Sequence, residues 1–285
     1  MHLNQSGQST TGGDGPSGRR FTRRLSVAAG LLVVGAVVAS ALLPSSEVGS
    51  AGPAEKKVVF VYGGWKGHAP VECRDLFVPW MESLGWNVTA SDSQDVYADA
   101  DLMGSVDLVV QTWTMGTIEK ENLQGLLAAV RGGVGIAGWH GGLADAYRQE
   151  TEYQFMIGGQ WVAHPGNTVD YTVQITDPED PVTRGLSDFA VHSEQYYMHV
   201  DPNNTVLATT GFTGEGASWI EGAVMPVVWK RVYGKGRVFY TSLGHSPDVF
   251  EIEEALTIMQ RGILWASESR HASTPGLVSP AYSTR

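Results

Sequence analysis

Three histidines stand directly after short apolar runs that are typical of buried strands. His68, His140 and His245 share this position, and His164 follows in a glycine-flanked loop. A neutral imidazole binds divalent metals and exchanges protons near neutral pH. Taken singly, each histidine is better explained as a hydrogen-bonded loop residue. Because the carboxyl ends of parallel strands meet along one edge of a sheet, the repeated placement favours a shared site.

The sequence around His140 has the spacing of a nucleophile elbow. Gly138-x-His140-x-Gly142 follows a short apolar strand and places an imidazole where a serine or cysteine would normally stand. A strand–turn–helix arrangement of this kind displays a side chain at the carboxyl end of the sheet. Since the usual nucleophile is missing, we expect His140 to bind a metal or to move protons.

An acidic segment could complete such a site. In Ser-Glu-Gln-Tyr-Tyr at 193–197, Glu194 and Tyr196 would share one face of a strand, because side chains alternate with a period of two. Glu194 is then a metal ligand or general base, and the Tyr196 hydroxyl is a hydrogen-bond donor to substrate. The alternative is a surface glutamate beside core tyrosines. The candidate metal ligands are therefore His140, His245 and Glu194.

Composition narrows the classes of partner. The 285 residues carry a formal net charge of −11 with no basic stripe, so nucleic acid is not an expected partner. Cys73 is the single cysteine, and its place in a predicted helix favours an inert buried thiol over a catalytic one. Trp65, Trp139 and Trp161 stand near the histidines in sequence, where their rings could stack on a sugar.

The elements expected to position these residues alternate between strand and helix. Apolar runs and helical periodicity predict strands at 57–62, 86–90, 106–112 and 134–139, and helices at 71–84, 118–131 and 143–157. This alternation indicates right-handed βαβ units and a doubly wound, mostly parallel α/β sheet with helices on both faces.

Beyond residue 157 the pattern becomes richer in strands. The segment 160–166 has the composition of a loop, and a final amphipathic helix is expected at 249–267. Further strands are predicted at 168–176, 189–197, 205–210, 227–233 and 237–242, the last two forming a hairpin.

Residues 1–50 have the features of an export signal. A Gly/Ser/Thr-rich start, expected to be disordered, is followed by arginine pairs at 19–20 and 23–24 and an apolar run at 25–43. We therefore expect a cleaved signal of the twin-arginine type and a secreted or cell-surface protein. The competing interpretation is an uncleaved segment that anchors the chain to the membrane through 25–43. The globular domain is expected at 51–269, followed by a flexible tail at 270–285.

Several motifs stand in a characteristic order along the chain. They are Gly-Trp-His140-Gly-Gly, Gly-Gly-Gln-Trp-x-x-His164-Pro-Gly, Asp-Pro-Val-Thr-Arg-Gly-Leu, Glu194-Gln-Tyr-Tyr and Gly-Arg-Val-Phe-Tyr-x-x-Leu-Gly-His245. Over residues 57–267, this ordered set resembles the ThuA-like (trehalose utilisation) family of the class I glutamine amidotransferase-like superfamily.

The resemblance implies a flavodoxin-like fold and a role in carbohydrate metabolism. It places a polar site on His68, His140, His164, Glu194 and His245, where it implies a divalent metal such as zinc. No nucleotide cofactor is expected. Amidotransferase relatives need a cysteine at the elbow, so the histidine at position 140 argues against glutamine hydrolysis.

Together these features predict an exported hydrolase, isomerase or lyase acting on a small-molecule carbohydrate: a disaccharide, glycoside or keto-sugar. The expected catalytic residues are His140, Glu194, His245 and Tyr196, and the expected substrate-binding residues are Trp65, His68, Trp139, Trp161 and His164. The alternative is a sugar-binding module without turnover, in which the tryptophans act as stacking platforms.

Overall fold

The computed structural model describes residues 55–273. In chain order, the strands are β1 Lys57–Gly64, β2 Asn87–Ser91, β3 Leu108–Thr114, β4 Gly135–Trp139, β5 Gly159–Ala163, β6 Thr168–Ile175, β7 Phe189–Glu194, β8 Tyr197–Val200, β9 Thr205–Gly211, β10 Val224–Tyr233 and β11 Gly236–Thr241. The helices are α1 Pro70–Ser83, α2 Ala100–Ser105, α3 Lys120–Gly132, α4 His140–Ala144, α5 Thr151–Ile157 and α6 Glu253–Ser267. Short 3-10 helices are η1 Lys66–His68, η2 Gln94–Tyr97, η3 Ser218–Ile220 and η4 Pro247–Glu251.

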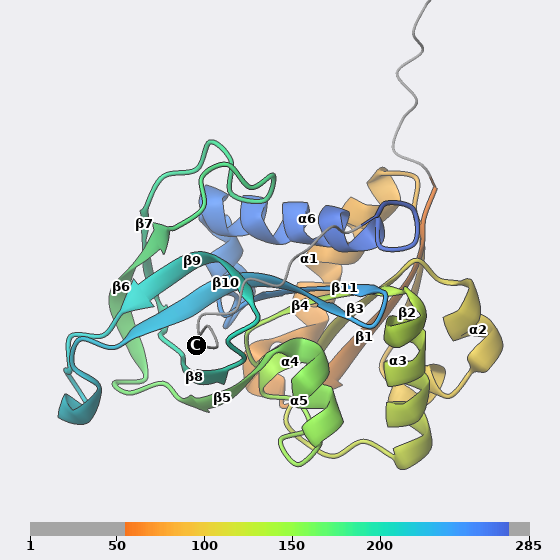
Figure 1. The fold of residues 1–285 in the computed structure, drawn as a ribbon, viewed down its shortest axis with the longest axis horizontal. Helices are drawn as coiled ribbons and strands as arrows, with labels where there is room; N and C mark the ends of the chain where they lie inside the picture. Colours follow the sequence, from red (N-terminus) through yellow and green to blue (C-terminus); the bar gives the residue numbers. More distant parts are fainter. Residues whose placement is uncertain (1–54, 274–285) are drawn as a thin grey trace, which may run out of the picture. The chain divides into compact units, whose positions relative to one another are not determined.

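Nine of these strands form one central sheet in the order β2-β1-β3-β4-β11-β10-β9-β6-β7, and β5 and β8 form a separate two-stranded sheet (Figure 1). The predicted export signal lies outside the described residues, as does most of the predicted tail. No helix within residues 55–273 combines the length and the apolar character needed to cross a membrane.

The parallel half of the sheet comprises β2, β1, β3, β4 and β11, whose neighbouring pairs are all parallel. The two faces of β1 show how this half is buried. Val58 and Phe60 pack in one apolar cluster with side chains of α1 and α6, whereas Val59 and Val61 pack in another with side chains of α3. Figure 1 shows these helices on opposite faces of the sheet. A strand covered on both faces carries a continuous apolar run rather than an alternating one.

The antiparallel half comprises β10, β9, β6 and β7. It begins with the predicted hairpin of β10 and β11, which is confirmed, and each further neighbour reverses direction. β9 and β7 therefore point the same way as the parallel strands. β7 also contacts η4, the short helix before α6. The far edge of the sheet thus curls back and brings the carboxyl end of β7 to the parallel half.

Two predictions of secondary structure are wrong. The single helix expected at 143–157 is broken into α4 and α5, because Asp145 pairs with Arg148 and Tyr147 takes a left-handed φ of 45° between them. The loop expected at 160–166 contains β5, which pairs with β8.

The strand expected at 189–197 is β7 followed by the start of β8. The chain changes sheets over Gln195 and Tyr196, so Glu194 is the last residue of its strand. The predicted fold class is nevertheless confirmed, since the fold is mixed α/β, seven of the nine strands of the central sheet point the same way, and helices lie on both faces.

Candidate active site

His140 occupies a strained elbow between β4 and α4. Its φ of 47° lies in the left-handed region, which costs a non-glycine residue roughly 1–2 kcal/mol. The flanking glycines are required by close backbone contacts. A Cβ at Gly138 would lie 2.5 Å from the Gln111 carbonyl oxygen, and one at Gly142 would lie 2.7 Å from the Thr112 Cα. The predicted elbow therefore exists, with an imidazole at its tip.

Two contacts fix the His140 ring, which is 1% exposed. Nδ1 lies 2.7 Å from the Ser242 carbonyl oxygen. Since a carbonyl only accepts, Nδ1 carries a proton, and Nε2 of the neutral ring presents a lone pair. Nε2 lies 3.0 Å from Glu194 Oε2. Burial lowers the pKa of His140 to about 4, which favours the neutral ring.

Glu194 is the carboxylate on which the site converges. Burial alone would raise its pKa, but the imidazoles of His140, His245 and His68 outweigh burial and hold the pKa well below its ordinary range. The carboxylate is therefore ionised. A neutral His140 carries its proton on Nδ1 and therefore offers Glu194 no N–H. Its Nε2 lowers the pKa of Glu194 only when a proton or another cation lies between Nε2 and Oε2.

His68 and His245 approach the same carboxylate oxygen. His68 Nε2 lies 3.8 Å from Glu194 Oε2, and its Nδ1 is hydrogen-bonded to Thr114 Oγ1 at 2.8 Å. His245 Nδ1 lies 3.3 Å from the same Oε2, and the carboxylate raises the pKa of His245. The His245 side chain is 25% exposed, so this is the more open side of the cluster.

His164 and Tyr196 complete the surroundings of Glu194. His164 Nε2 lies 3.7 Å from Oε1, the other carboxylate oxygen. The Tyr196 ring stacks on the His140 ring with centroids 4.0 Å apart. Burial raises the pKa of Tyr196 well above its ordinary value, so its hydroxyl keeps its proton. All four predicted histidines, Glu194 and Tyr196 are thus brought together.

The three predicted tryptophans differ in position. Trp65 is 47% exposed and meets the His68 ring edge-on, with centroids 4.8 Å apart. The ring centroids of Trp161 and His164 lie 5.7 Å apart. The Arg148 guanidinium carbon lies 4.5 Å from the Trp161 ring centroid. Trp65 and Trp161 therefore lie beside the histidine cluster.

Trp139 does not line the site. It is buried in the core, where its ring packs against Phe77 and Phe250. The expectation that Trp139 binds substrate is therefore wrong, because a strand residue one position before the elbow points into the apolar layer. Cys73 is buried as expected, and burial raises its pKa to about 12.

Sequence reasoning missed the residues that orient the histidines. Thr114 and Ser242 contact His68 and His140, and each stands at or just after the carboxyl end of a strand. A polar residue closing an apolar strand is the signal that could have found them. Asp145 is also buried, bound by Arg148 through Nε at 2.5 Å and Nη2 at 2.9 Å.

The donor set fits a metal ion. One ligand atom from each of His68, His140, Glu194 and His245 lies within 4.8 Å of the others, and such nitrogen and oxygen donors are typical of zinc sites. Outer contacts orient two of these imidazoles, as in protein metal centres generally. His245 Nδ1 is buried without a hydrogen-bond partner among the described residues. The cluster could therefore hold a metal ion.

Comparison with known proteins agrees with this architecture. The sequence model of the ThuA family, described as trehalose utilisation, matches residues 57–266. A putative ThuA-like protein from Bacteroides uniformis superposes with a TM-score of 0.64 at 14% identity, covering 76% of this chain and 93% of that one. A putative ThuA-like protein from Parabacteroides merdae gives 0.59 at 19% identity, covering 75% and 90%.

A cytoplasmic protein from Salmonella typhimurium LT2 gives a TM-score of 0.51 at 14% identity, covering 75% of this chain and 98% of that one. At these identities the solved structures show the fold alone. No curated protein sequence matches the chain.

Proposed function

The chain belongs to the ThuA family, described as trehalose utilisation, and we propose that it is a metal-dependent enzyme of carbohydrate metabolism. Its substrate is a disaccharide, glycoside or keto-sugar, and its reaction is a hydrolysis, isomerisation or lyase step that depends on proton transfer. The observation that carries the proposal is the convergence of four imidazoles on the buried carboxylate of Glu194.

His68, His140, His245 and Glu194 would hold a divalent metal such as zinc. A bound ion of this kind acts as a Lewis acid on a carbonyl oxygen and lowers the pKa of bound water. The fixed rings of His68 and His140 support this assignment, because ligands held by outer hydrogen bonds lose little freedom when they bind.

Other residues of the chain would handle the substrate. His68 and His140 are buried, whereas His245 and His164 are partly exposed, so a sugar reaches the site from their side. His164 stands by the second oxygen of Glu194, where it can exchange a proton with a sugar carbon or oxygen.

Tyr196 and two tryptophans complete the proposed substrate site. Tyr196 keeps its hydroxyl proton and can donate a hydrogen bond to a sugar oxygen. Trp65 and Trp161 offer apolar ring surface beside the cluster.

Turnover distinguishes this enzyme from a sugar-binding module. The zinc-loaded chain is incubated with trehalose, an aryl glycoside and a keto-disaccharide, and products are followed by NMR. We expect a new product from at least one of them and a loss of at least about 100-fold in rate for His140→Ala. His192→Ala is the matched control, because His192 is exposed on β7 and pairs with the surface residue Asp170.

Calorimetry with the same sugars separates the remaining outcomes. Binding without product after long incubation contradicts the enzyme and supports the binding module. Absence of binding to any of the three sugars contradicts both.

Export is a separate part of the proposal and rests on residues 1–50 alone. Sequencing the amino terminus of protein recovered outside the cytoplasm tests it. We expect the mature chain to begin at Ala51. An intact apolar segment in the membrane fraction would instead support the anchored form.

A further inference from the structure

A pocket opens beside the histidine cluster at the carboxyl ends of β1, β2 and β3. Its volume is about 490 Å³, within the usual range for small-molecule sites. Tyr62, Gly63, Lys66, Asp92 and Trp113 contribute to its lining. None of these residues was expected from the sequence to bind a ligand.

The topology makes this edge a natural ligand site. β1 lies between β2 and β3, and the chain leaves β1 toward α1 on one face but leaves β3 toward α3 on the other. Connections that diverge in this way open a crevice between the carboxyl ends of neighbouring strands, where ligands bind in open α/β sheets.

The lining combines fixed aromatic rings with free charges. A Cβ at Gly63 would lie 2.5 Å from Trp113 Cζ3, so the glycine lets the indole lie directly against the backbone. The Tyr62 hydroxyl accepts a hydrogen bond of 2.9 Å from Arg74 Nη1, which fixes the second ring.

Lys66 and Asp92 are exposed, and the side chain of neither is engaged in an ion pair or hydrogen bond within residues 55–273. Rigid aromatic surface with a carboxylate and an ammonium group nearby suits the apolar faces and hydroxyls of a pyranose ring.

Short covalent links join this pocket to the histidine cluster. Trp113 precedes Thr114, whose hydroxyl is hydrogen-bonded to His68. Lys66 belongs to η1 together with His68. Trp65 links the two sites, since its backbone N–H donates to the Thr114 carbonyl oxygen and its ring contacts His68. A ligand of two linked rings could therefore place one ring at the histidine cluster and the other in the pocket.

We propose that this pocket is a second sugar subsite that holds the non-reacting ring of a disaccharide. The proposal rests on the proposed function, because it assumes that the histidine cluster receives the first ring. Trp113 and Tyr62 would contact the ring, and Asp92 and Lys66 would bind its hydroxyls. The preferred substrate would then be a disaccharide rather than a monosaccharide.

Calorimetry of the zinc-loaded full chain with trehalose and with glucose tests the subsite. We expect trehalose to bind at least about tenfold more tightly than glucose. Trp113→Ala should remove this difference by weakening trehalose binding about tenfold while leaving glucose binding unchanged. Asp92→Asn should weaken trehalose binding in the same direction by a smaller factor. Because Asp92 is exposed, this second variant keeps the test valid if Trp113→Ala fails to fold.

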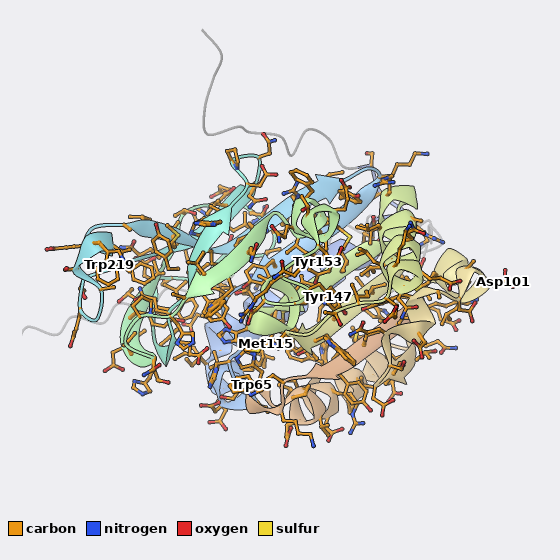
Figure 2. All side chains as sticks on the ribbon, turned by 90° about the horizontal axis from the view of Figure 1, so that it is seen from below. Trp65, Asp101, Met115, Tyr147, Tyr153 and Trp219 are labelled. Atoms are coloured by element: carbon orange, nitrogen blue, oxygen red, sulfur yellow. The ribbon has the colours of Figure 1, made fainter. Side chains whose placement is uncertain are left out.

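Two matched controls sit far from the pocket. Trp219 is 85% exposed on η3, and Asp101 is exposed on α2. In Figure 2 they lie at opposite sides of the view, well separated from Trp65. Trp219→Ala and Asp101→Asn should leave both affinities unchanged.

The outcomes separate the two proposals. Trehalose binding that neither Trp113→Ala nor Asp92→Asn weakens, or equal affinity for trehalose and glucose in the intact chain, contradicts the subsite alone. Absence of binding for both sugars contradicts the carbohydrate function and the subsite together.

Discussion

The parallel and antiparallel halves of the sheet supply the site in different ways. In the parallel half, His68 and His140 each follow a strand, and His245 comes four residues after the end of β11. In the antiparallel half, Glu194 closes the edge strand β7. His164 comes from neither half, because it follows β5 of the separate two-stranded sheet. The bases thus come mainly from one half and the acid from the other.

This difference teaches how the site is assembled. The parallel topology alone places its histidines at a common edge, because all its strands end there. Glu194 reaches the same place only because the sheet curls and β7 meets η4. The carboxylate therefore depends on tertiary packing across the whole sheet, whereas the spacing of the histidines depends on local connections.

The largest loss of turnover is expected when Glu194, the residue that the antiparallel half contributes, is substituted. Glu194→Gln keeps the shape of the side chain but removes the charge on which the four histidines converge. We expect the rate of sugar turnover to fall by roughly 10³-fold or more, with the fold retained. Steady-state kinetics measures the loss. Glu221→Gln, at an exposed position outside the cluster, is the control, and equal rates for both variants would contradict a role for Glu194.

A smaller effect is expected from disturbing the parallel half. A Cβ at Gly141 would lie 2.5 Å from His68 Cε1, so Gly141→Ala must displace the His68 ring. We expect a loss of about 10–100-fold in kcat/KM, as is typical when a metal ligand is misoriented. Gly132→Ala is the matched control, because a Cβ there would meet nothing within 4 Å. Unchanged kinetics in Gly141→Ala would show that the position of His68 is unimportant.

The free energy of unfolding should depend on pH, because burial at the carboxyl end of β4 lowers the pKa of His140. Its pKa is about 4 in the folded chain, against an ordinary value of 6.5. Between these values the unfolded chain binds a proton that the folded chain excludes, so stability falls as pH drops from 6.5 toward 4. The full contribution is about 3 kcal/mol.

Denaturant unfolding of the metal-free protein measures this contribution. His140→Asn removes the titrating group, so the variant should gain stability relative to the intact chain as pH falls through that window. A difference between the two proteins that stays constant from pH 7 to pH 4 would contradict the buried, neutral state of His140.

The smallest effect is expected at Cys73, which lies on α1, packed against the parallel half but outside the cluster. Burial raises its pKa to about 12, so almost no thiolate exists at pH 8. We expect iodoacetamide to leave the native chain unmodified and Cys73→Ala to keep turnover within about twofold. Rapid alkylation accompanied by loss of activity would instead support a cysteine-dependent reaction.

The same division explains what could be predicted from sequence. Apolar runs located the strands of the parallel half, and the rule for strand ends then grouped His68, His140 and His245. The role of the elbow glycines at 138 and 142 could also be predicted, because the strand–turn–helix motif recurs in proteins and its close backbone contacts require glycine at these positions.

The features that could not be predicted from sequence depend on contacts between residues that the local sequence pattern does not reveal. β5 was mistaken for a loop because its partner β8 lies in another part of the sequence. The helical pattern of 143–157 concealed the break at Tyr147, since the ion pair between the buried Asp145 and the partly exposed Arg148 stabilises the turn. Trp139 was misplaced because sequence proximity to His140 says nothing about which face of the strand its ring occupies.

Zinc binding tests most directly whether the two halves form one centre. The full chain, His140→Ala and Glu194→Gln are titrated with zinc against a competing chelator. We predict one zinc ion per intact chain, and an affinity at least about 100-fold weaker in either variant, with His192→Ala unchanged. An intact chain that binds no zinc, or variants that bind it as tightly as the intact chain, would contradict a shared metal centre.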